Sequence, residues 1–150
     1  MKNLYEAHDA NEIRERIALL KPDSPRRWGK MNAAQAVAHC AASMEWAVGD
    51  RIPPRILVPG LVGRLIKPLV LRDDKPFRRN SPTSPDLLVQ NRRDLDAERQ
   101  RLCALIDRFT AAGPVGCTTN PHSFFGRMTP EQWAILTYKH LDHHLRQFGV

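Results

Sequence analysis

The sequence predicts an all-α fold: a four-helix bundle with a long crossover connection that carries short helices, formed by residues 1–150 as a single domain. Three observations lead to this prediction. Four segments repeat apolar residues at the three- and four-residue spacing of a helix that buries one face. No segment alternates apolar and polar residues as a half-buried strand does, and there is no internal repeat. A long connection separates the second and third helical segments, which permits a crossover.

The first two predicted helices cover residues 9–20 and 32–48. In the first, isoleucine and leucine recur at helical spacing and charged residues fill the other face, until a proline-containing stretch ends it. In the second, Asn32 and Gln35 have the spacing of a capping box. Its alanine-rich body should let a neighbouring helix approach closely. The alanines expected to be buried there are Ala38, Ala41 and Ala42.

The connection over residues 51–85 holds seven of the 12 prolines of the chain. Residues 55–71 are apolar enough to form one or two short helices packed on the bundle, and residues 73–80 are expected to be an exposed loop. Eight basic and two acidic side chains give residues 51–79 a net charge of +6. This charge is either a solvated surface or a means of attracting an anionic substrate. A nucleic-acid partner is not expected, because Phe77 alone offers an aromatic ring for base stacking.

The last two predicted helices cover residues 94–112 and 129–148. In the earlier one, Leu95, Leu102 and Phe109 recur every seven residues, and a Gly-Pro pair closes the helix. In the later one, a threonine at the cap position is followed by proline at the favoured first position and then by glutamate, which suits the positive end of a helix.

Three of the six histidines lie in the last predicted helix, inside a stretch of five residues. His140 and His144 are four residues apart, so they share the inward face of that helix. His39 lies on the inward stripe of the second helix, and a buried imidazole needs a partner. Three neutral imidazoles could hold a divalent ion (Zn²⁺, Ni²⁺, Fe²⁺ or Mn²⁺) and leave a coordination position open. Their ring nitrogens should then lie within about 4 Å of one another. The alternative is a metal-free cluster of hydrogen-bonded histidines.

Four further residues are candidates for contact with the site or its substrate. His143 lies about 60° around the helix from His140 and is a reserve ligand or a neighbour of the site. His122, in the loop before the last helix, either packs within that loop or faces a pocket. Lys75 and Arg78, in the basic connection, are candidates for capturing an anionic small-molecule substrate. The simpler interpretation of both basic residues is that they are solvated.

The bulk composition bears on the cellular setting. Three cysteines without CxxC spacing argue against a disulfide framework and indicate a reducing, cytoplasmic compartment. No apolar run approaches the ~20 residues of a membrane-spanning helix, so no membrane association is expected. The N-terminus lacks the apolar core of a signal peptide.

Three stretches read MNAAQAVAH at residues 31–39, TPEQW at residues 129–133 and HLDHHLRQ at residues 140–147. Together they give the chain a resemblance, over essentially its whole length, to the DinB-like (DinB/YfiT) superfamily of metal-binding four-helix bundles. The chain is most similar to a branch of unknown function. The sequence pattern of the superfamily has one histidine in the second helix and an HxxxH pair in the last helix. The metal ligands that the resemblance implies are His39, His140 and His144.

The resemblance also implies a chemistry. Characterised members of the superfamily include S-transferases that use small thiol cofactors, a mycothiol-dependent maleylpyruvate isomerase, and hydrolases. A metal in such a site turns a bound thiol or water into a nucleophile at neutral pH. The resemblance therefore implies a metal-dependent transferase or hydrolase, with a low-molecular-weight thiol as a further cofactor. The alternative is a non-catalytic bundle that binds a small molecule or a partner subunit, such as a second copy in a homodimer.

Overall fold

The computed structural model describes residues 1–55 and 57–150, and in this part of the chain the regular structure is helical, with no β-strand. The four α-helices of the bundle are α1 (Ala7–Leu19), α2 (Ala33–Val48), α4 (Leu95–Ala112) and α5 (Pro130–Gln147). The elements between them are α3 (Leu57–Val70) and the short 3₁₀ helices η1 (Pro85–Leu87) and η2 (Pro114–Gly116). The all-α prediction is therefore confirmed. None of the helices in these described residues is long and apolar enough to cross a membrane.

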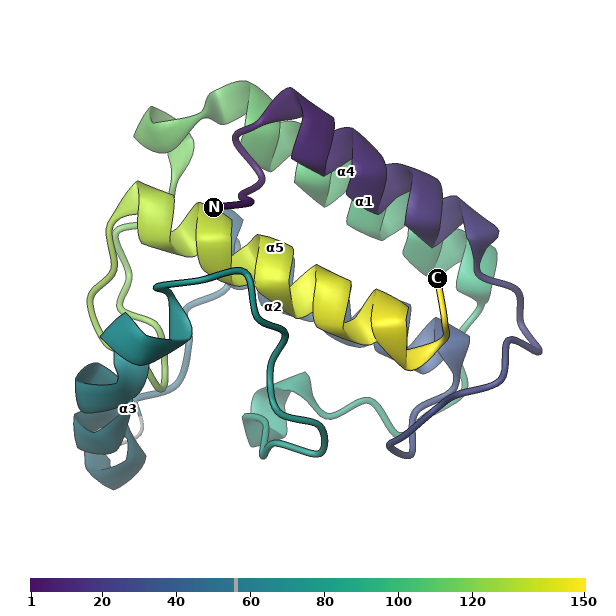
Figure 1. Ribbon diagram of the computed structural model, residues 1–150, viewed down its shortest axis with the longest axis horizontal. Coiled ribbons are helices and arrows are strands. Elements are labelled where there is room, and N and C mark those ends of the chain that lie inside the picture. Colours follow the sequence, from purple (N-terminus) through teal and green to yellow (C-terminus); the bar gives the residue numbers. More distant parts are fainter. Residues whose placement is uncertain (56) are drawn as a thin grey trace.

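The order of the helices around the bundle differs from their order in the chain, as Figure 1 shows. α1 packs against α4 and α5, and α2 packs against the same two helices, so α1 and α2 occupy opposite corners. α2 and α4 run in the same direction, which places Glu45 beside Arg101, and Asp50 beside Arg108, in two ion pairs. A connection between two parallel neighbours must return along the length of the bundle. The predicted crossover between the second and third long helices is therefore present.

Local signals set the ends of the long helices. α2 begins with a capping box formed by Asn32 and Gln35, and α5 begins with one formed by Thr129 and Gln132. α2 ends at Val48 and is capped by Gly49, whose φ of 86° is the left-handed conformation that glycine adopts at little cost. All four long helices begin and end within two residues of the predicted positions.

The crossover contains one helix where the sequence predicts one or two short ones over residues 55–71. Residue 56 lies outside the described residues, and most of the rest forms the 14-residue helix α3. In Figure 1, α3 projects away from the bundle, and the chain then passes across α5 and runs below α5 and α2 to η1 and α4. The crossover therefore covers the side of the α2–α5 pair that lies away from α1 and α4.

Two of the contacts that attach the crossover to the rest of the protein involve α3. α3 packs on the turn before α5 at Gly63, where an added Cβ would lie 1.8 Å from the carbonyl oxygen of Phe124. At the other end of α3, the ammonium of Lys139 donates hydrogen bonds to the carbonyl oxygens of Val70 and Asp73, at 2.6 and 2.7 Å. Carbonyls at the end of a helix have no partner within the helix. Lys139 supplies one, and so ties the crossover to the histidine-rich part of α5.

The alanine stripe of α2 lies in the core, as predicted. The exposed fractions of Ala38, Ala41 and Ala42 are 1%, 0% and 7%. Trp46 on α2 and Trp133 on α5 are each 1% exposed and fill the same side of the core one to two turns away from the histidines. Small side chains next to the histidines thus let α2 approach its neighbours, and large ones fill the wider space beyond.

The close packing of α2 predicts that Ala42→Leu lowers the free energy of unfolding by roughly 1–3 kcal/mol, because the added methylenes have no space to enter. Urea denaturation of the purified variant measures this loss. Ala111→Leu is a matched control, since Ala111 lies on the exposed face of α4 and should tolerate the same change. Equal stability of the two variants would contradict the placement of α2.

Candidate metal centre

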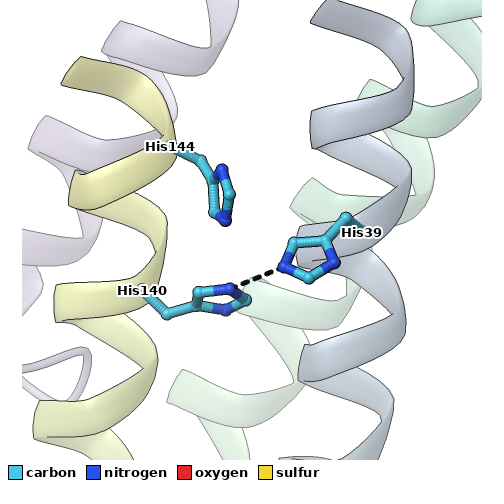
Figure 2. Close-up of side chains that lie close together, drawn as sticks. All are labelled: His39, His140 and His144. Atoms are coloured by element: carbon cyan, nitrogen blue, oxygen red, sulfur yellow. Dashed lines mark hydrogen bonds between the residues drawn. The ribbon is translucent and has the colours of Figure 1, made fainter. Parts of the chain in front are cut away.

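His39, His140 and His144 come together where α2 and α5 pass each other in opposite directions, as Figure 2 shows. One ring nitrogen from each residue lies within 4.8 Å of the other two. The three ring centroids are 4.7 to 4.9 Å apart, and the rings are turned edge to face. The side chain of His39 is only 2% exposed, and the other two are partly buried. The structure thus unites three histidines that the helical spacing placed on two inward faces.

The crossover fixes the tautomer of His39. Its Nδ1 lies 2.8 Å from the carbonyl oxygen of Leu87 in η1. A carbonyl oxygen can only accept a hydrogen bond, so Nδ1 carries the proton. In the neutral ring, Nε2 then has a free lone pair, and this atom faces His140.

A glutamine on the same helix fixes the tautomer of His144. Its Nδ1 lies 2.8 Å from Oε1 of Gln147, while Nε2 of Gln147 donates to the carbonyl oxygen of Trp28 at 2.8 Å. The second bond orients the amide, so the atom facing His144 is the oxygen, and His144 Nδ1 donates. Gly29 makes room for this link, because a Cβ there would lie 2.5 Å from Nε2 of Gln147. The lone pair of His144 is therefore also on Nε2.

His140 is held differently from the other two. Its Nε2 lies 2.9 Å from Nε2 of His39, and it donates, because the His39 atom has the lone pair. Two nitrogens bound to one tetrahedral ion at 2.1 Å lie about 3.4 Å apart. This pair would need to separate by about 0.5 Å around an ion, whereas nitrogens at the 4.8 Å limit would need to close by about 1.4 Å. The proton of His140 would also have to move to Nδ1. Coordination of one ion by all three rings would therefore require side-chain shifts of about 0.5 to 1.4 Å and this change of tautomer.

Burial keeps the three rings neutral. Removal from water disfavours the charged imidazolium and lowers the pKa of His144 to about 3. Burial also lowers the pKa of His39 and lowers that of His140 well below its ordinary value. Repulsion from the neighbouring histidines lowers the pKa of His140 further. At pH 7 all three rings are neutral, and the neutral imidazole is the form that binds a metal.

Nearly the whole chain, residues 2–149, matches one family model, described as "Protein of unknown function (DUF1569)". The chain belongs to this family. No curated protein and no solved structure matches it. The match includes the three histidines and both helices that carry them. The family description assigns no activity, so the chemistry of the site has to be argued from its residues.

In this member of the DUF1569 family, His143 lies beside the three-histidine cluster but not within it. Its ring is 5.1 Å from that of His144 and contacts Trp28 at 5.5 Å and Phe77 at 5.9 Å. The residue is 8% exposed, and burial lowers its pKa. His143 is thus a buried neighbour of the cluster, between the loop that precedes α2 and the crossover.

His122 also lies apart from the cluster. Its Nδ1 accepts hydrogen bonds from the backbone amides of Phe124 and Phe125, at 3.1 and 3.2 Å. Its ring packs against Trp46 and Trp133, with centroids 5.7 and 5.4 Å away. Burial lowers its pKa to about 4. The side chain therefore organises its own turn and fills the core between α2 and α5.

The two predicted anion-binding residues are on the surface. The Lys75 side chain is 80% exposed, with Nζ 3.8 Å from a carboxylate oxygen of Asp73. Arg78 is exposed. Among the described residues, neither side chain forms a hydrogen bond or an ion pair with the histidine cluster. The neighbouring Arg79 instead stacks on Trp28, with the guanidinium carbon 4.4 Å from the ring centre.

Within the described part of the chain, one other group offers ligand atoms within 4.8 Å of one another, namely His8, Asp9 and Glu12 at the start of α1. Its carboxylates already have partners. The carboxylate of Asp9 accepts a hydrogen bond from the backbone amide of Asn3 at 3.0 Å, and Glu12 forms an ion pair with the ammonium of Lys2. The three histidines, by contrast, bring one ring nitrogen each within 4.8 Å of the other two and have no carboxylate partner among the described residues, so this cluster is the stronger candidate.

Proposed function

We propose that the protein binds one divalent metal ion, Zn²⁺, Ni²⁺, Fe²⁺ or Mn²⁺, through Nε2 of His39, His140 and His144. One observation supports this most directly. The Nδ1 protons of His39 and His144 are committed to the Leu87 carbonyl and the Gln147 amide oxygen. Histidines that bind metals usually donate their other N–H group to such an acceptor, which fixes the tautomer and turns the free lone pair toward the ion. The same bundle and histidine placement support membership in the DinB-like superfamily.

Three protein ligands leave a coordination position open, which is the arrangement of catalytic rather than structural zinc sites. An ion held there would lower the pKa of a bound water or thiol and so supply a nucleophile at neutral pH. We therefore propose a metal-dependent enzyme of the S-transferase or hydrolase type, acting on a small molecule. The three unpaired cysteines agree with the reducing, cytoplasmic setting that a low-molecular-weight thiol requires.

A second candidate is a non-catalytic bundle that binds a small molecule or a partner subunit. The direct hydrogen bond between His39 and His140, at 2.9 Å, favours it, because this bond partly satisfies the buried rings without an ion. In that case the histidines serve as a polar cluster that specifies how α2 packs on α5.

Metal analysis separates the two candidates. Protein expressed without a histidine tag, and purified without chelator, should contain close to one equivalent of a transition metal by mass spectrometry. After removal of the metal, it should take up one equivalent of Zn²⁺ in competition with a chromophoric chelator. Protein that is folded yet takes up none of the four ions would establish the non-catalytic candidate instead.

Gln147 should contribute to metal affinity without touching the ion. Gln147→Leu removes the acceptor for Nδ1 of His144, so we expect the affinity for Zn²⁺ to fall roughly 10- to 100-fold. Gln147→Glu keeps an acceptor at the same place and should retain much more of the affinity than the leucine variant. Competition with a chromophoric chelator measures both. Wild-type affinity in a correctly folded leucine variant would show that the Gln147 bond does not orient a ligand.

A further inference from the structure

Four side chains from three separate segments meet next to His144. Trp28 comes from the connection between α1 and α2, Phe77 and Arg79 come from the crossover, and His143 comes from α5. Successive contacts link them: Arg79 lies 4.4 Å from the Trp28 ring, Trp28 lies 5.5 Å from His143, and His143 lies 5.9 Å from Phe77. We call this group the Trp28 cluster. It lies where the crossover covers the α2–α5 pair.

Arg79 differs from most basic residues near it in having no ion pair among the described residues, and from Arg78, which also has none there, in its contact with an aromatic ring. Arg72 and Lys75 are close to the carboxylate of Asp73, and Lys67 donates to a backbone carbonyl. Arg79 has no ion pair among the described residues, and its guanidinium is held over an indole ring instead. Stacking uses the face of the guanidinium and leaves the N–H groups at its edge available. Arg79 is therefore a positioned cation whose donors remain free to bind an anion.

The same tryptophan is attached to the histidine cluster. The carbonyl oxygen of Trp28 accepts a hydrogen bond from Nε2 of Gln147. Oε1 of Gln147 accepts one from Nδ1 of His144, and both bonds are 2.8 Å long. The segment that positions Arg79 is thus fixed to the partner of a proposed metal ligand. His143, 5.1 Å from His144, adds a second contact between the two clusters. Trp28, which carries Arg79, and Phe77 both contribute apolar ring surface beside His143.

We propose that Arg79 binds the carboxylate of a small organic acid whose other end reaches the three-histidine centre, with Trp28 and Phe77 packing against the part between. A carboxylate matches the planar fork of a guanidinium, which makes two parallel hydrogen bonds to it. The inference rests on the proposed function and specifies its substrate class. It also replaces Lys75 and Arg78 with Arg79 as the anion-binding residue.

The test compares two ligands that differ in charge and in one methyl group. The full chain is loaded with Co²⁺, and binding of 3-mercaptopropionate or of its neutral methyl ester is followed by the thiolate-to-cobalt absorption band. The acid should bind roughly tenfold more tightly than the ester. Arg79→Gln should abolish this preference and leave the affinity for the ester unchanged. Arg72→Gln, which removes a nearby exposed arginine, should keep the preference, and the visible cobalt spectrum confirms that each variant retains its metal centre.

The possible failures are distinguishable. Equal affinity of the wild type for acid and ester, or a preference that survives Arg79→Gln, overturns the inference and leaves the metal centre intact. Loss of the preference in Arg78→Gln instead of Arg79→Gln overturns it in favour of the neighbouring residue. A cobalt-loaded protein that binds neither thiol overturns the proposed substrate. If the folded chain takes up no Co²⁺, the proposed function fails, and this inference fails with it.

Discussion

Replacing His140 with alanine is expected to remove most of the stabilisation that a metal ion gives the protein. An ion that binds only the folded state at 1,000 times its Kd adds about 4 kcal/mol to the free energy of unfolding. Removing an outer partner of a ligand already lowers affinity 10- to 100-fold, so loss of a ligand should lower it by at least about 100-fold. At the same metal concentration the stabilisation then falls to about 1.4 kcal/mol or less.

Urea denaturation with Zn²⁺ and with chelator measures this stabilisation separately for each variant, so effects on the metal-free fold cancel. His143→Ala is the matched control. Its ring contacts Trp28 and Phe77 rather than the point where the three histidines meet, so the variant should keep most of the stabilisation. The ligands would be assigned wrongly if His143→Ala lost the stabilisation by Zn²⁺ and His140→Ala kept it.

The metal-free protein is expected to lose stability as the pH falls from 7.5 to 5. The pKa of a histidine in the unfolded chain is about 6.5, and burial lowers that of His144 to about 3 in the folded protein. Below pH 6.5 the unfolded state therefore binds a proton that the folded state does not, and stability decreases until the pH reaches the folded pKa. At pH 5 each histidine that stays neutral in the folded state costs about 2 kcal/mol. His39 and His140 act in the same direction.

Urea denaturation in the presence of chelator at pH 7.5, 6.5 and 5 gives the size of this loss. His144→Asn should reduce the loss between pH 7.5 and 5 by about 2 kcal/mol, because one buried neutral imidazole is removed. His8→Asn is the control, since His8 is exposed and its removal should leave the loss unchanged. A wild-type protein that is equally stable at pH 7.5 and pH 5 would contradict the burial of the cluster. Burial lowers the pKa of all three rings in the folded protein, so protons compete less with a bound ion for these rings than for exposed histidines.

The long helices could be predicted from the sequence because their limits depend on neighbouring residues. Asn32 with Gln35, and Thr129 with Gln132, form capping boxes within a single turn. Helical periodicity identifies the inward faces of α2 and α5. It therefore also predicted that the three histidines on these faces come together. Prolines interrupt residues 55–71, which is why the sequence alone did not indicate one continuous helix α3.

The surroundings of the histidines depend on contacts between distant parts of the chain. His39 forms a hydrogen bond with a backbone carbonyl 48 residues away in the sequence. Every residue has such a carbonyl, so the sequence does not indicate which one is the partner. The spacing of His144 and Gln147 on one helix was visible, but the bond from Gln147 to Trp28 spans 119 residues. Likewise, the choice between Arg78 and Arg79 depends on which of two adjacent loop side chains faces Trp28. Periodicity cannot decide that in a segment without regular structure.

Anomalous X-ray scattering from crystals of the untagged, Zn²⁺-loaded protein would show whether α2 and α5 hold one ion between His39, His140 and His144. We expect one strong peak at the zinc absorption edge, about 2.1 Å from a ring nitrogen of each of these three residues. A peak at His8, Asp9 and Glu12 instead, or crystals in which the three histidines bond to one another with no zinc between them, would contradict it.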